Sequence, residues 1–113
     1  MAINPFLLIS GVSGLIFAIA GFLMLKFPPK KINSLYGYRT KRSMSSQELW
    51  DFSQIYSARL MSRSGLLMIG IGLLGQFFQL SEGQASFFGL GILLTMCFML
   101  FWKTEQAMRE REE

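Results

Sequence analysis

The chain has 113 residues, of which 51% are hydrophobic and 16% are charged, and its formal net charge is +4. This composition is too apolar for an ordinary soluble domain of this length. The sequence contains no histidine, so the commonest general base and transition-metal ligand is missing. The single cysteine, Cys97, excludes an intramolecular disulfide and a multi-cysteine metal site. We therefore expect one membrane domain, residues 1–113, of the all-α class.

The first expected transmembrane helix covers about residues 6–27. Asn4 is a suitable N-cap, and Pro5 occupies the first helical position, where proline is best tolerated. Residues 6–25 carry no charge, and at ~1.5 Å per residue they extend about 30 Å, the thickness of a bilayer core. Small residues recur every three or four positions on one face, which predicts close packing against another helix. These residues are Ser10, Gly14, Ala18 and Gly21.

Residues 28–63 form the polar part of the chain, predicted as a loop followed by an amphipathic helix. The loop, called here the GYRT loop after residues 37–40, contains Gly37 between two tyrosines, where a positive φ is expected. A capping box with Ser45 as N-cap and Glu48 three residues later predicts the start of the helix. This helix suits the membrane surface, with Trp50 and Tyr56 at headgroup depth. It has no glycine or proline before residue 65, so it could run directly into the next span.

Two further spans are expected at about residues 64–80 and 86–102, followed by a charged tail at 103–113. The second span is short and requires Arg63 to extend toward the interface. One of its faces carries small and amide residues and is expected to face protein. The residues of this face are Gly65, Gly72, Gln76 and Gln79. In the tail, Glu105 and Arg109 are spaced for an ion pair on one helix.

The distribution of charge predicts the orientation. Residues 26–63 carry eight Lys/Arg against two acidic residues. Positively charged segments stay in the cytoplasm. The N-terminus is then outside, and residues 28–63 and the tail are cytoplasmic.

Between the membrane interfaces, the expected spans contain no Asp, Glu, Lys, Arg or His, which argues against a proton relay, an ion pump or a voltage sensor. With neither histidine nor clustered carboxylates, we expect no catalytic residues, no metal site and no cofactor. Two readings of the basic cluster Arg39, Lys41 and Arg42 remain open: attraction to anionic lipid headgroups, and recognition of a ligand or partner by Arg39 beside Tyr38 and Trp50. Nucleic-acid binding would require a larger basic face and is not expected.

The GYRT loop and the helix after it share a pattern of residues with a known family. The residues of this pattern are Asn33, Gly37, Tyr38, Arg39, Thr40, Arg42, Ser43, Met44, Trp50 and Gln54. In these residues the chain resembles the SdpI family of small bacterial membrane proteins. It has Lys41 where many members have proline, and Ser53-Gln54 where Ala-Asn is common. One span before the loop and two after it is the family's minimal layout.

The resemblance implies a multi-pass protein of the bacterial inner membrane. The family's founding member is an immunity protein against a secreted peptide toxin, and it also holds a repressor at the membrane. We therefore expect a non-catalytic protein that binds a toxin peptide or a regulatory protein. The expected binding residues are Tyr38, Arg39, Thr40, Arg42 and Trp50. The alternative is a structural or transport accessory protein that self-associates through its small-residue faces as a homo-oligomer.

Overall fold

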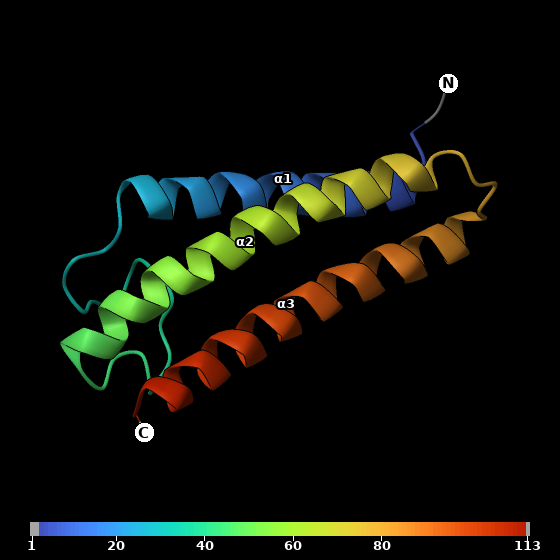
Figure 1. The fold of residues 1–113 in the computed structure, drawn as a ribbon. Coiled ribbons are helices and arrows are strands. Elements are labelled where there is room, and N and C mark those ends of the chain that lie inside the picture. The colour runs from blue at the N-terminus through green and yellow to red at the C-terminus, as the bar shows by residue number, and fades with distance from the viewer. Residues whose placement is uncertain (1–2, 113) are drawn as a thin grey trace.

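The structure is a computed structural model that describes residues 3–112, and all regular secondary structure within this range is helical (Figure 1). The three helices are α1 (Pro5–Lys26), α2 (Gln47–Gly75) and α3 (Glu82–Glu112). Consecutive helices run antiparallel, so α1 and α3 point in the same direction, and the molecule is elongated, with extents of 50 × 25 × 20 Å. The expected all-α class is confirmed.

Helix α1 begins as its sequence predicts. The Asn4 Oδ1 atom accepts a hydrogen bond of 2.9 Å from the backbone N–H of Phe6, and Pro5 follows as the first helical residue. Asn4 thereby satisfies one of the amide groups that have no partner at a helix start.

The α1–α2 interface is built from the small residues predicted to pack. A Cβ atom on Gly14 would lie 2.5 Å from the carbonyl oxygen of Gly65, so the two backbones are in direct contact. The Ser10 hydroxyl donates a hydrogen bond of 2.7 Å to the carbonyl of Met68. Residues Ser10, Gly14, Ala18 and Gly21 are all buried, as are Gly65 and Gly72. The small-residue faces therefore face each other within one chain.

Helix α2 is a single uninterrupted helix that joins the polar residues 47–63 to the apolar residues 64–75. Its N-cap is Ser46, whose hydroxyl accepts a hydrogen bond of 3.1 Å from the backbone N–H of Leu49, so the prediction of Ser45 as N-cap was wrong by one residue. The Ser45 hydroxyl instead donates to the carbonyl of Arg42 at 2.6 Å.

The end of α2 also differs from the prediction, because the helix stops at Gly75 and not near residue 80. The next amides bond to carbonyls three residues back, which tightens the chain into a turn: Phe77 to Leu74 at 3.1 Å and Phe78 to Gly75 at 3.1 Å. Gln76 follows the last turn, and its Oε1 atom accepts from the backbone N–H of Asn4 at 3.1 Å. Gln79 is exposed in the connection, so its predicted place on a packing face was wrong.

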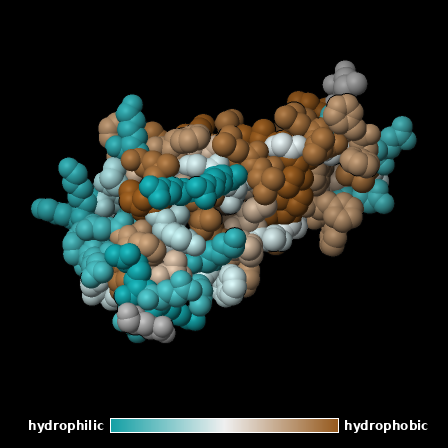
Figure 2. Space-filling view, viewed as in Figure 1, coloured by the Kyte–Doolittle hydropathy of each residue, from teal (hydrophilic) through white to brown (hydrophobic). Residues whose placement is uncertain are grey.

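Two helices, α1 and α3, are long and apolar enough to cross a membrane. Most of their apolar surface is exposed, because only 28% of the most apolar stretch of α1 and 11% of that of α3 are buried. Figure 2 shows most of the hydrophilic residues gathered at the end that carries the GYRT loop, a smaller hydrophilic group at the opposite end, and a largely hydrophobic surface between them. These features indicate a membrane protein.

Candidate binding site

The GYRT loop, which joins α1 to α2, is anchored on buried side chains of α2. Trp50 is fully buried and donates a hydrogen bond of 2.8 Å from its indole nitrogen to the carbonyl of Pro29. Trp50 therefore faces the protein interior and not lipid headgroups, and its role as a binding residue stays a prediction. Its indole has its hydrogen-bond partner inside the protein, as buried tryptophans usually do.

Gln54 fixes the turn at the centre of the loop. It is 1% exposed, and its amide binds both backbone groups of Tyr38: Oε1 accepts from the N–H at 2.6 Å and Nε2 donates to the carbonyl at 2.8 Å. The preceding residue, Gly37, has φ +108°, which confirms the positive φ expected there. A Cβ atom on Gly37 would lie 2.5 Å from the Gln54 oxygen, so a side chain is excluded by both space and conformation.

Thr40 and Ser43 close the next turn by reciprocal hydrogen bonds. The Ser43 hydroxyl accepts from the backbone N–H of Thr40 at 2.8 Å, and the Thr40 hydroxyl accepts from the N–H of Ser43 at 3.1 Å. Ser43 is fully buried although it is polar. Side chains of this type stabilise turns by bonding to the backbone nearby.

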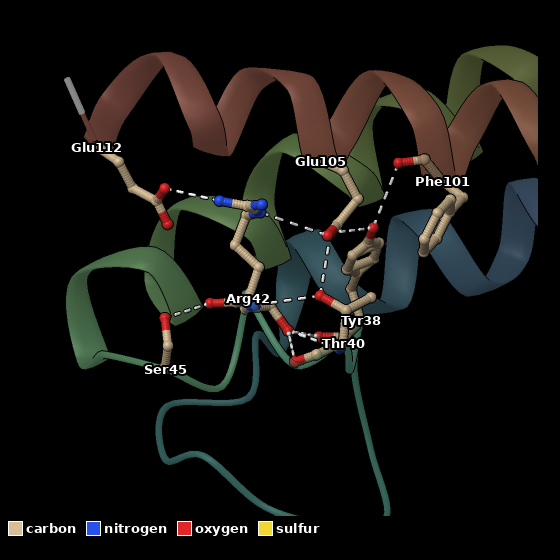
Figure 3. Close-up of polar contacts among 8 residues, drawn as sticks. Tyr38, Thr40, Arg42, Ser45, Phe101, Glu105 and Glu112 are labelled. Carbon is tan, nitrogen blue, oxygen red and sulfur yellow. Dashed lines mark hydrogen bonds and ion pairs between the residues drawn. The ribbon is translucent and has the colours of Figure 1, made fainter.

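Glu105 of α3 connects the loop to the third helix (Figure 3). Its carboxylate accepts a hydrogen bond of 2.7 Å from the Tyr38 hydroxyl and one of 3.0 Å from the Thr40 hydroxyl. The Arg42 Nε atom lies 3.7 Å from the same carboxylate, and Arg42 Nη1 donates to Glu112 at 2.6 Å. Burial and, after it, the hydrogen bond with Glu105 raise the pKa of the Tyr38 hydroxyl above its ordinary value, so the phenol remains a neutral donor.

The structure therefore separates the predicted binding residues into two groups. Tyr38, Thr40 and Arg42 are directed toward α3, and their polar groups are engaged with Glu105 and Glu112. Arg39 is exposed and donates a hydrogen bond to the carbonyl of Ser34. Lys41 is also exposed. A second molecule thus has direct access to Arg39 and Lys41.

A groove of about 590 Å³ lies where the GYRT loop meets α3. Lys41 and Arg42 line it from the loop, and Phe101, Glu105 and Glu112 line it from the helix. The groove therefore combines one aromatic ring with charges of both signs. Such a surface can bind a peptide segment through ion pairs and hydrogen bonds at the rim.

Sequence reasoning did not identify Glu105 as part of this site. It assigned Glu105 an ion pair with Arg109 on the same helix, because residues four apart on a helix are neighbours. In the structure, the Glu105 carboxylate instead contacts Tyr38 and Thr40, which lie more than 60 positions earlier in the chain. No local sequence pattern indicates such a long-range contact. Gln54, which holds the backbone of Tyr38, is among the residues that carry the family resemblance.

The fold and the ordered loop define a small, helical membrane protein whose polar features are concentrated at one end. The model of the SdpI/YfhL protein family matches residues 30–102. The uncharacterized protein YfhL of Bacillus subtilis (strain 168) is 45% identical over 98 residues, which cover 87% of this chain and 84% of that relative. No solved structure shows significant similarity.

The chain belongs to the SdpI/YfhL family. The matched region contains the GYRT loop, α2 and most of α3. It ends three residues before Glu105, so the carboxylate that connects the loop to α3 lies outside it.

Proposed function

We propose that this chain is a non-catalytic membrane protein of the SdpI type, which binds a toxin peptide or a partner protein through the GYRT loop. The observation that carries the proposal is the fixed geometry of the loop. A segment that served only as a topology signal would need positive charge and no defined conformation. Here Gln54 and Glu105 hold the loop backbone and side chains in place, while Arg39 and Lys41 remain exposed.

Preorganisation lowers the entropic cost of binding, because the loop does not have to be ordered when the partner arrives. Arg39 can offer a planar guanidinium to a carboxylate or a backbone carbonyl of the partner. The adjacent groove, with Lys41 and Glu105 on its two sides, can bind the neighbouring residues of a peptide.

In this proposal all three helices cross the bacterial inner membrane, with the N-terminus outside and the C-terminus in the cytoplasm. The apolar residues 64–75 of α2 extend only about 18 Å at ~1.5 Å per residue. However, Asn4 at the start of α1 hydrogen-bonds to Gln76 at the end of α2, so the two helices reach the same level. If α1 spans the bilayer, α2 spans it too, and local thinning of the bilayer accommodates the shorter apolar stretch.

The alternative function is a structural or transport accessory protein that self-associates through the small-residue faces. These faces are not exposed for contact with a second copy. The small-residue faces of α1 and α2 are buried against each other, with Gly14 in contact with Gly65. A homo-oligomer remains a prediction, and it would have to use another surface.

A toxin-protection assay tests the proposed function. The chain is expressed in a bacterium that is sensitive to secreted peptide toxins, and survival is measured over a range of toxin concentrations. We expect the wild type to protect against at least one peptide. Arg39→Lys should abolish this protection, because it keeps the charge and removes the planar guanidinium.

The matched control is Lys31→Arg, a charge-preserving change at an exposed position of the same loop, which should protect like the wild type. Expression and membrane insertion are compared by immunoblotting of membrane fractions. Full protection by Arg39→Lys would show that only the charge of the loop matters. Absence of protection by the wild type against all peptides would argue against the immunity role.

A further inference from the structure

A second groove, of about 540 Å³, lies along α2 beside the last turns of α3. It shares no lining residue with the groove at the GYRT loop. Its lining includes apolar and aromatic side chains: the rings of Phe52 and Tyr56 lie 5.5 Å apart, and Ile55 and Leu60 line the groove with them. These side chains are only partly buried, so the groove is an open feature of the surface.

The two ends of the groove differ in charge. At one end, Glu48 forms an ion pair of 3.4 Å with Arg111, whose guanidinium lies 4.5 Å from the centre of the Phe52 ring. Asp51, at the same end, accepts a hydrogen bond of 2.7 Å from Gln47. The acidic groups at this end therefore already have partners.

Arg59 and Arg63 line the other end, one helical turn apart. Both are exposed, and within residues 3–112 neither forms an ion pair with a carboxylate. Arg59 is eight residues from Asp51, or about 12 Å along the helix at ~1.5 Å per residue. This end of the groove is therefore positively charged and well separated from the acidic end.

The two arginines also mark the boundary between the polar and apolar parts of α2. Residues 64–75 carry no charge, and Leu66 and Leu67, three and four residues after Arg63, are more than half exposed. A helix that enters a bilayer at this point places Arg59 and Arg63 at the depth of the lipid headgroups and the two leucines against acyl chains.

We propose that this groove is a binding site for an anionic phospholipid. The lipid phosphate lies between the guanidinium groups of Arg59 and Arg63, which match phosphate oxygens in geometry and charge. The acyl chains extend past Leu66 and Leu67 toward the bilayer core. A lipid fits this site better than a protein segment does. The two arginines without carboxylate partners lie at headgroup depth in this placement, and the exposed leucines follow them toward the bilayer core. The inference depends on the membrane placement in the proposed function and not on peptide binding.

Native mass spectrometry of the purified protein, titrated with phosphatidylglycerol or phosphatidylcholine, tests the site. We expect tighter binding of phosphatidylglycerol by the wild type. Because each basic residue near a membrane surface contributes about 1 kcal/mol, Arg63→Gln should weaken that binding about fivefold and the double variant Arg59→Gln/Arg63→Gln about thirtyfold. Inorganic phosphate alone should not compete, since it lacks acyl chains.

The matched control is Lys30→Gln/Lys31→Gln, which removes two exposed charges outside the groove and should bind like the wild type. The inference is overturned if the wild type binds both lipids equally or if the control loses as much binding as the double variant. It is also overturned if the arginine variants bind normally or if the groove holds a second copy, detected as a dimer that the double variant abolishes. None of these outcomes depends on toxin protection, so the two proposals can fail separately.

Discussion

At the residue scale, one carboxylate joins segments far apart in the sequence. Glu105 is 15% exposed at its side chain and accepts hydrogen bonds from the hydroxyls of Tyr38 and Thr40. Sequence reasoning predicted the local conformation of the loop, such as the positive φ of Gly37, because that depends on neighbouring residues. It missed Glu105 because nothing near position 105 indicates which distant hydroxyls the carboxylate contacts.

Replacement of Glu105 should therefore loosen the loop. Glu105→Gln removes the charge that the two hydroxyls and Arg42 share, and we expect the free energy of unfolding to fall by about 1–2 kcal/mol. Unfolding in mild detergent, followed by circular dichroism, measures the change. Glu110→Gln, at an exposed position of the same helix, should change it by less than about 0.5 kcal/mol. Equal stability of the two variants would contradict a structural role for Glu105.

At the element scale, α1 and α2 are in direct contact, since glycines at their interface bring backbone against backbone. The spacing of small residues predicted this contact, because close approach of helices requires the absence of side chains at those positions. The end of α2 was not predictable in the same way. Residues 76–80 continue the apolar pattern, but the chain turns after Gly75, which packs against the ring of Phe6.

A methyl group at the interface should separate the two helices. In Gly14→Ala the added Cβ would lie 2.5 Å from the Gly65 carbonyl oxygen, so we expect a loss of about 1–3 kcal/mol in the free energy of unfolding. Gly70→Ala is the matched control, because apart from its own turn of helix no heavy atom lies within 4 Å of the added Cβ, and alanine favours the helix by up to about 1 kcal/mol. Detergent unfolding measures both. If the two substitutions changed the free energy of unfolding equally, α1 and α2 would not be in close contact.

At the scale of the whole molecule, polarity is divided along the long axis. The GYRT loop, the first half of α2 and the end of α3 form a hydrophilic end, and the remaining surface is mainly hydrophobic (Figure 2). Composition and charge predicted this division, because both follow directly from the order of residues. The contacts that hold the polar end together depend on three segments meeting in space, which the sequence pattern does not specify.

The location of this polar end underlies both proposals, and thiol labelling in intact cells tests it most directly. In a Cys97→Ser background, Ser34→Cys places a thiol in the GYRT loop and Gly83→Cys places one at the opposite end, where the glycine has open space around it. We predict that a membrane-impermeant reagent labels the cysteine at position 83 in intact cells and the one at position 34 only after permeabilisation. Labelling of position 34 with protection of position 83 would put the GYRT loop outside the cell and contradict the account.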